Sequence, residues 1–232
     1  MTTVTITGAD DATPIDRMVA LSERFPFLEW GILLSDSRTG GPRYPSVGWV
    51  RALMRQNLPL SAHLCGAVAR TFMSGLAGLP FFVAPSELFQ RIQVNGYAAG
   101  SAERLPFARR TGFEYILQAH DELTIYACAL DTEKARASCS ILFDPSGGAG
   151  RNWSKRWPRV LPGTRMGYAG GFGPDTVAER IAEIREVNGG APPAWVDMES
   201  NVRDSDDRLD LAAVETVLET VARINTGDFR AR

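Results

Sequence analysis

Short runs of β-forming residues recur along the whole chain, and nearly every gap between them is long enough for a loop and a helix. The eight runs are Thr3 to Thr7, Glu29 to Leu34, Leu60 to Cys65, Phe89 to Val94, Phe113 to Leu117, Cys139 to Phe143, Thr164 to Tyr168 and Ala194 to Val196. Strands that alternate with helices are joined by right-handed crossovers and run parallel to one another. Eight such units in 232 residues are typical of a closed (β/α)8 barrel near the lower end of its usual length.

The gaps late in the chain carry the clearest helical pattern. Two sets of apolar residues recur at helical spacing: Val177, Ile181, Ile184 and Val187, and then Val214, Val217, Leu218 and Val221. A doubly wound open sheet is the rival architecture for such alternation. Because no linker or block of charge interrupts the series, residues 1–232 are predicted to form one α/β domain, a single (β/α)8 TIM barrel.

Charge and cysteine usage narrow the classes of partner. The 25 Lys and Arg residues nearly balance the 27 Asp and Glu residues, which gives no broad electrostatic reason to expect nucleic acid or a membrane surface. A small neutral or anionic ligand fits this balance. The cysteines Cys65, Cys128 and Cys139 are odd in number and lack metal-type spacing, so a reducing cytoplasm is expected. The amino-terminal residues show no signal-peptide pattern, and no run has the length of a membrane span.

Three stretches depart from the regular pattern. Residues 76–85 and 151–163 are irregular, and the second is either a poorly formed outer helix or a mobile flap over the site. The polar run from Asp204 to Arg208 is expected to be a short solvated loop just before a helix that starts near Leu209.

In such barrels the active site lies at the carboxyl ends of the strands. The sixth run is followed by Asp144 and a glycine-rich loop with Gly147 and Gly148, for which a plain tight turn is the alternative. The seventh run ends in Gly170 and Gly171 just before a predicted helix start. That arrangement is the geometry of an anion site.

The end of the eighth run extends this candidate anion site. Asp197, Ser200, Asn201 and Arg203 follow it and supply a second set of backbone amides with a nearby guanidinium. Loops after strands seven and eight form the usual phosphate cradle of such barrels. The sequence therefore predicts a small anionic, phosphorylated ligand, and no metal or organic cofactor.

Strands two and three supply further candidates. Arg43 precedes a predicted helix start near Ser46, where it either binds a ligand carboxylate or lies in an exposed loop. Alternation places His63 and Cys65 on the same side of strand three, either both inside the barrel or both toward the helices. A buried, hydrogen-bonded histidine and an inert cysteine are the ordinary alternative to a catalytic pair.

Taken in order, these segments resemble the phosphoribosylanthranilate isomerases, which perform an Amadori rearrangement on a phosphoribosylated aromatic amine. The likeness is strongest from Ile141 to Asp210, where the chain reads ILFDPSGGAGRNW, AGGFGPDTV and VDMESNVRD. These segments resemble the family's strand-six aspartate loop, its glycine pair and its strand-eight end. Nearer the amino terminus, VTITG resembles the family's opening strand, PRYPS resembles its SKRYIS-type segment, and QVNG resembles its QLHG strand end. The resemblance implies a TIM barrel with aldose–ketose isomerase chemistry.

Transferred residue by residue, the resemblance makes Asp144 the general acid that protonates the sugar-ring oxygen and Arg43 the contact for a substrate carboxylate. Asp197 matches a position where the family also has an aspartate. The residues that the resemblance places around the phosphate are Gly170, Gly171, Ser200 and Asn201.

The resemblance fails at the catalytic base, which in the family is a cysteine and here is Thr7. A threonine hydroxyl cannot act as an unaided base near neutral pH. A displaced base would then have to come from His63 or Cys65, with Asp10 and Asp11 as lesser candidates.

Three classes of function follow. The first is an isomerase that works by acid–base proton transfer on a phosphorylated sugar-type substrate. The second is a lyase or aldolase-like barrel with altered chemistry at His63 or Cys65. A Schiff base on a strand is disfavoured there, since Lys134 and Lys155 are the only lysines and neither lies in a predicted strand. The third is a binding protein that keeps its phosphorylated ligand and has lost turnover.

Overall fold

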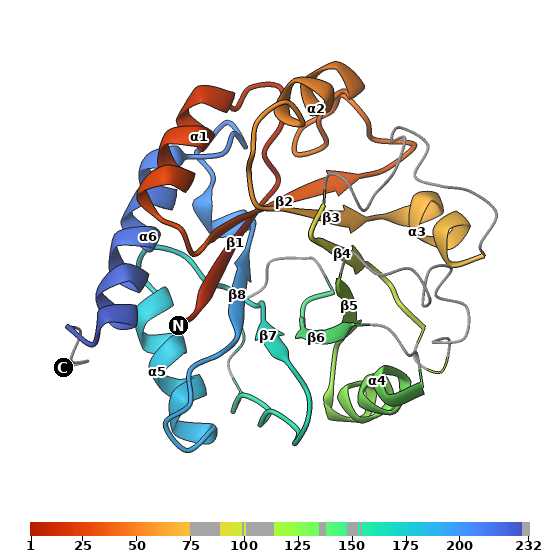
Figure 1. Cartoon of the computed structure of the whole chain (residues 1–232), viewed down its shortest axis with the longest axis vertical. Coiled ribbons are helices and arrows are strands. Elements are labelled where there is room, and N and C mark those ends of the chain that lie inside the picture. The colour runs from red at the N-terminus through yellow and green to blue at the C-terminus, as the bar shows by residue number, and fades with distance from the viewer. Residues whose placement is uncertain are drawn as a thin grey trace.

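Eight parallel strands close into a barrel in a computed structural model that describes residues 1–74, 89–98, 100, 114–134, 138–147, 153 and 155–228. The strands are β1 (Thr3–Thr7), β2 (Leu28–Leu34), β3 (Leu60–Leu64), β4 (Arg91–Val94), β5 (Glu114–Ala119), β6 (Cys139–Phe143), β7 (Met166–Tyr168) and β8 (Trp195–Met198). Each strand pairs with the next in sequence, and β8 pairs with β1 (Figure 1). The predicted barrel is confirmed, and the open sheet is excluded.

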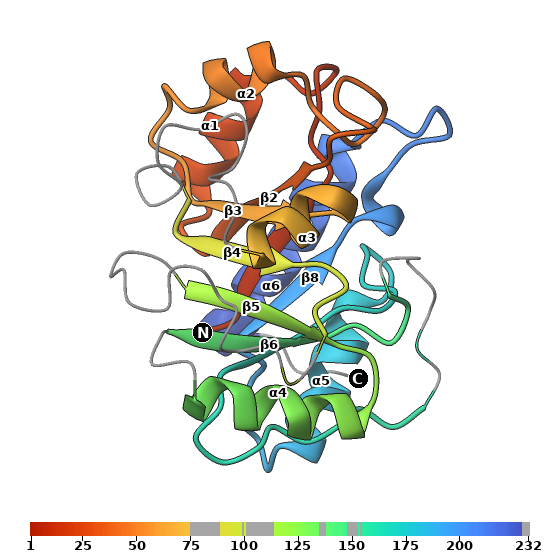
Figure 2. The ribbon, with the colours of Figure 1, turned by 90° about the vertical axis from the view of Figure 1, so that its right-hand side faces the viewer.

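Helices cover the outside of this barrel (Figures 1 and 2). They are α1 (Ile15–Arg24), α2 (Val47–Leu53), α3 (Gly66–Met73), α4 (Glu122–Lys134), α5 (Val177–Val187), α6 (Leu211–Thr226) and the short 3₁₀ helix η3 (Ser200–Val202). The helical faces predicted for α5 and α6 pack on the barrel, with Val187 only partly buried. Within the described residues, none of the helices combines the length and apolar character that crossing a membrane requires.

Side-chain caps set two of the helix starts. Ser46 lies at the predicted start of α2, and its Oγ accepts a hydrogen bond from the Trp49 amide at 3.2 Å. The last helix begins two residues later than predicted, because the Asp210 carboxylate accepts hydrogen bonds from the amides of Ala212 and Ala213.

The irregular segment between β6 and β7 covers the barrel wall without a helix, as far as residues 153 and 155–163 are described. Trp157 is buried, and its ring centroid lies 5.7 Å from that of Tyr168 and 5.6 Å from that of Phe172. Of the two alternatives left open for this segment, its described residues do not form the outer helix, and aromatic packing holds them against the barrel. The other irregular segment, residues 76–85, lies outside the described residues.

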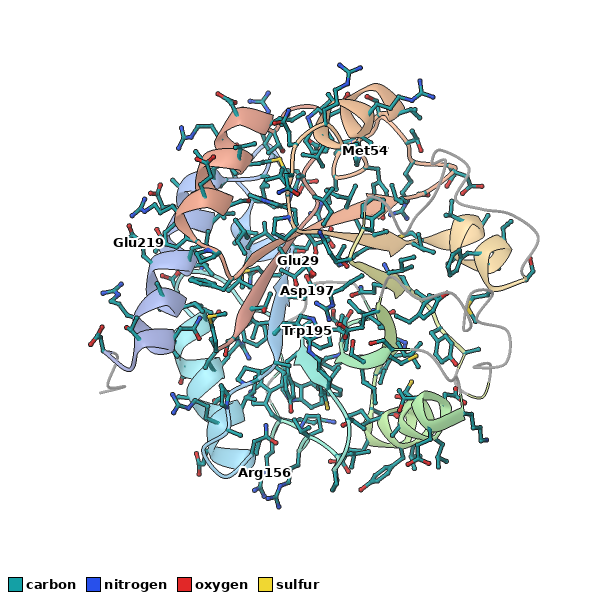
Figure 3. The ribbon with its side chains drawn as sticks, viewed as in Figure 1. Glu29, Met54, Arg156, Trp195, Asp197 and Glu219 are labelled. Atoms are coloured by element: carbon teal, nitrogen blue, oxygen red, sulfur yellow. The ribbon has the colours of Figure 1, made fainter. Side chains whose placement is uncertain are left out.

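Charged side chains fill the barrel below its carboxyl end. The Arg91 guanidinium lies 3.0 Å from the Glu29 carboxylate, which also accepts a hydrogen bond from Thr5 Oγ1 at 2.8 Å. Arg91 also stacks over Trp195, with 4.0 Å between the guanidinium carbon and a ring centroid. Figure 3 shows Glu29, Trp195 and Asp197 gathered at the centre of the barrel. These charged side chains, together with Trp195, form a floor for any site above them.

Candidate functional site

A pocket, here called the inner pocket, opens at the carboxyl ends of the strands. It brings together eight of the residues singled out from the sequence: Thr7, His63, Asp144, Gly170, Gly171, Asp197, Ser200 and Asn201. These residues come from β1, β3 and the ends of β6, β7 and β8, so the strand ends converge as the barrel topology requires.

Asp197 and Thr7 form a hydrogen-bonded pair in this pocket. Thr7 Oγ1 donates to Asp197 Oδ1 at 2.8 Å, and both side chains are buried. The pKa of Asp197 is raised from 3.8 to about 8, mainly by burial and also by the carboxylates of Glu199, Asp144 and Glu29, while the Thr7 hydrogen bond opposes the rise. Asp197 therefore holds a proton at neutral pH.

Asp144 lies in the same pocket in a different setting. Its Oδ1 accepts hydrogen bonds from the Ser146 amide at 3.0 Å and the Ser146 hydroxyl at 2.7 Å. Its Oδ2 accepts one from Gln118 Nε2 at 2.8 Å. Donors thus point at both oxygens, which is the pattern of a carboxylate.

His63 is buried beside Thr7, and its Nε2 has no hydrogen-bond partner among the described residues. The pKa of His63 is lowered to about 3, mainly by burial and also by the charge of Arg91, so the imidazole is neutral. Gly31 on β2 lies between the two side chains. A Cβ there would lie 2.3 Å from Thr7 Oγ1 and 3.0 Å from His63 Nε2. A side chain at this position would therefore have to displace Thr7 or His63, and the place of the glycine inside the apolar run LEWGILL was the available sequence signal.

A second and wider cavity, here called the outer cavity, adjoins the inner pocket. The two share Leu33, Asn95 and Glu199. Cys65 lines the outer cavity, and burial raises the pKa of its thiol although Asn95 Nδ2 donates to the sulfur at 3.1 Å. Cys65 is therefore a thiol and a poor base.

Arg43 also lines the outer cavity, and two carboxylates already engage its guanidinium. It donates to Glu199 Oε1 at 2.7 Å and to Asp207 Oδ1 at 2.6 Å. Its backbone amide donates to Asp10 Oδ2 at 2.7 Å. Arg43 thus links the loops that follow β1, β2 and β8.

Arg203 is absent from the lining of the inner pocket. Its buried guanidinium donates to the Gly8 carbonyl at 2.9 Å and to Asp207 Oδ1 at 2.9 Å. Asp207 had been expected to be part of a solvated loop. Its side chain is 46% exposed, in keeping with that expectation, and it also accepts hydrogen bonds from both Arg43 and Arg203.

The loops after β7 and β8 meet at the rim of the inner pocket. Gly170 and Gly171 have φ values of 121° and 84°, in the region that favours glycine. A Cβ on Gly173 would lie 2.7 Å from Asn201 Cβ, which shows how closely the two loops approach each other. Gly147 lines the outer cavity, and Gly148 lies outside the described residues. Among the described residues, no group of three or more His, Cys, Asp and Glu side chains could hold a metal ion.

Solved structures with the same architecture include several phosphoribosylanthranilate isomerases. The dimeric enzyme from Thermotoga maritima, in its monomer form, matches with a TM-score of 0.61 and 14% identity over 96% of this chain and 99% of that chain. The chain has the fold of the phosphoribosylanthranilate isomerases. TrpF from Jonesia denitrificans matches with a TM-score of 0.60 and 17% identity over 97% of this chain and 98% of that chain.

Other barrels share this fold at a lower score. KGPDC from Streptococcus mutans matches with a TM-score of 0.53 and 11% identity over 97% of this chain and 99% of that chain. No protein-family model and no curated protein matches the sequence. The resemblance to the isomerases thus holds for the fold, and the activity has to be argued from the site.

Proposed function

We propose that this protein is an isomerase that works by acid–base proton transfer on a phosphorylated sugar-type substrate. The observation that carries the proposal is the pair of carboxyl groups, Asp144 and Asp197, in unlike surroundings within one pocket. Isomerisation needs one group that gives a proton and one that takes a proton. Two carboxyl groups whose surroundings favour opposite protonation states meet that need.

Asp197 is the better donor in this pair, and Asp144 the better acceptor. The resemblance assigned the acid role to Asp144, but the hydrogen bonds that Asp144 accepts favour the opposite assignment. In the proposed reaction Asp144 takes the proton from carbon 2 while Asp197 gives one to the oxygen on carbon 1. As the enediol collapses, Asp144 returns its proton to carbon 1, and the oxygen on carbon 2 returns a proton to Asp197. Both groups are restored.

The phosphate is proposed to bind at the rim, between Gly170, Gly171, Ser200 and Asn201. Glycines in the left-handed region let backbone N–H groups approach an anion without a side chain in the way. Two of the structural neighbours carry phosphorylated ligands in their crystals. One is a phosphoribosylanthranilate isomerase with reduced 1-(O-carboxyphenylamino)-1-deoxyribulose 5-phosphate, and the other is KGPDC.

The outer cavity is proposed to hold the rest of the substrate. Arg43 would reach a substrate carboxylate only after releasing Asp207, so the exposed Arg38 and Arg70 are the better-placed cations in this cavity. Neither has an ion pair among the described residues. A reducing compartment such as the cytoplasm suits the three free thiols.

A binding protein without turnover is the second candidate, because Thr7 occupies the position of the family's catalytic thiol. A Schiff-base lyase is less well supported. Lys134 ends α4 and Lys155 lies between β6 and β7, so neither lysine projects from a barrel strand.

The test is a panel of phosphorylated aldoses and ketoses, assayed with the wild type and with Asp144→Asn and Asp197→Asn. Each substitution should lower kcat by about 10²- to 10⁴-fold on the true substrate, because each removes one proton-transfer group. Phosphoribosylanthranilate itself should turn over slowly or not at all, since Thr7 cannot act as its base. Wild-type activity in both variants would refute the proposed pair.

Binding is tested separately from turnover by thermal shift with inorganic phosphate. Gly171→Val should abolish the phosphate-induced stabilisation, because a branched side chain would crowd the rim. Gly163→Val is the matched control. Gly163 also has a positive φ, of 77°, but a Cβ added there would meet nothing within 4 Å, and the residue lies outside the inner pocket. Phosphate binding without turnover would select the binding protein.

A further inference from the structure

Two buried side chains of the inner pocket each have a polar atom without a hydrogen-bond partner among the described residues. The atoms are His63 Nε2 on β3 and Gln93 Oε1 on β4. Both residues line the inner pocket, although they are only 1% and 4% exposed. A buried polar atom that lacks a partner costs free energy, so two such atoms in the wall of one pocket indicate a place that a ligand completes.

The two side chains are neighbours across the sheet. His63 pairs with Gln93 in the register of β3 and β4, so both side chains leave the sheet on the same side. Adjacent strands lie about 4.8 Å apart. A hydrogen bond to a hydroxyl oxygen spans about 2.8 Å, so one small polar group between the two side chains can bond to both.

The hydrogen bonds of the Gln93 amide show which kind of group this is. Gln93 Nε2 donates to Asn95 Oδ1 at 2.8 Å, and Asn95 Nδ2 in turn donates to Cys65 Sγ at 3.1 Å. This order of donors leaves Gln93 Oε1, which can only accept, as the unpaired atom of the amide. The group that binds it must therefore carry a hydrogen, which excludes a carboxylate and a carbonyl oxygen.

His63 distinguishes between the groups that do carry a hydrogen. The pKa of His63 is lowered mainly by burial and also by the charge of Arg91, and that same charge disfavours an ammonium group beside it. A neutral imidazole has one nitrogen that donates and one that accepts. A hydroxyl group can give its hydrogen to Gln93 Oε1 and accept one from His63 Nε2, so it satisfies both atoms at once.

We infer that His63 and Gln93 form a hydroxyl-binding subsite of the inner pocket, which holds a sugar hydroxyl next to the reacting carbons of the substrate. His63 lies beside Thr7, and Thr7 is hydrogen-bonded to Asp197, so the subsite adjoins the proposed proton-transfer pair. The inference rests on the proposed function for the kind of ligand, a phosphorylated sugar, and not for the reaction. In this role His63 binds the substrate and does not replace the missing base.

The test is isothermal titration calorimetry of the full-length protein with D-ribose 5-phosphate, its 2-deoxy and 3-deoxy analogues, and inorganic phosphate. The wild type should bind ribose 5-phosphate more tightly than inorganic phosphate. At least one deoxy analogue should bind about 10- to 100-fold more weakly than ribose 5-phosphate, because without the hydroxyl both buried atoms stay unpaired.

Substitutions show whether the subsite causes this difference. Gln93→Met and His63→Phe each remove one of the two unpaired atoms with little change in size, and each should bind ribose 5-phosphate and the weaker analogue with nearly equal affinity. Ser61→Ala is the matched control. Ser61 also lies on β3 and has a buried Oγ without a partner among the described residues, but it is outside the inner pocket, so Ser61→Ala should keep the wild-type difference.

Circular dichroism confirms that each variant is folded, and the two substitutions on different strands report independently. Equal affinity of the wild type for ribose 5-phosphate and both deoxy analogues would overturn the inference. So would ribose 5-phosphate that binds no more tightly than inorganic phosphate, or a difference that survives in both variants. Failure of the proposed function looks different, because the preference for the hydroxyl then persists although no phosphorylated aldose or ketose turns over.

Discussion

Replacing Asp197 by asparagine should change how the stability of this protein depends on pH. Asn keeps the shape of the side chain and an oxygen that can accept the Thr7 hydrogen bond, but it cannot ionise. Since the pKa of Asp197 is raised in the folded state, the folded protein binds a proton that the unfolded chain releases. This contribution to stability is fully present below about pH 4 and is lost as pH rises through about 8.

The structure sets the size of the effect. The span from 3.8 to about 8, at about 1.4 kcal/mol per pH unit, gives an upper limit of about 6 kcal/mol by pH 9. Water entering the pocket or a small movement of Glu199 would make the pKa shift of Asp197 smaller. The free energy of unfolding of the wild type is therefore expected to fall by about 2 to 4 kcal/mol. Asp197→Asn should escape this loss.

The assay is urea denaturation of both proteins at pH 5, 7 and 9. The free energy of unfolding of the wild type should fall relative to that of Asp197→Asn as pH rises, with the gap widest at pH 9. Other groups titrate in both proteins, so the difference between the two curves isolates Asp197. Parallel curves would refute the reasoning, because they would mean that Asp197 is ionised in the folded protein throughout this range.

Three further predictions concern the floor and wall of the pocket. Gly31→Ala should destabilise the fold by about 2 kcal/mol or more in urea denaturation, because its Cβ would overlap Thr7 and His63; unchanged stability would mean that the strands adjust freely. Arg91→Met should cost about 3 to 5 kcal/mol at pH 7 in urea denaturation, since it leaves the Glu29 carboxylate buried without its partner, and an unchanged free energy of unfolding would contradict this. Thr7→Cys should raise any turnover of phosphoribosylanthranilate, and no gain in kcat would show that the pocket is shaped for a different substrate.

Local patterns in the sequence were sufficient to predict the barrel. Strand runs separated by helix-length gaps permit few topologies once crossovers must be right-handed. The apolar faces of α5 and α6 follow from a helical period that needs no tertiary information. The position of the pocket follows as well, because parallel strands place all their carboxyl ends on one side of the barrel.

Strand ends were less well predicted where polar residues continue a strand inside the barrel. Asp197 was placed after the eighth run, but β8 extends to Met198. In a sequence, a carboxylate is typical of the residue that follows a strand. Inside a barrel, a carboxylate can be part of the strand itself when polar side chains surround it.

Only the tertiary structure decided what the charged groups do. Thr7 and Asp197 are 190 residues apart, and the protonation of Asp197 depends on its burial, on that contact and on carboxylates from several parts of the chain. The sequence left Arg43 either at a ligand carboxylate or in an exposed loop and placed Arg203 beside the candidate anion site, but in the structure the Asp207 carboxylate binds both guanidinium groups. Electrostatic interactions act through space over a few ångströms, so a sequence can name the charges in a site, and the fold decides which of them meet.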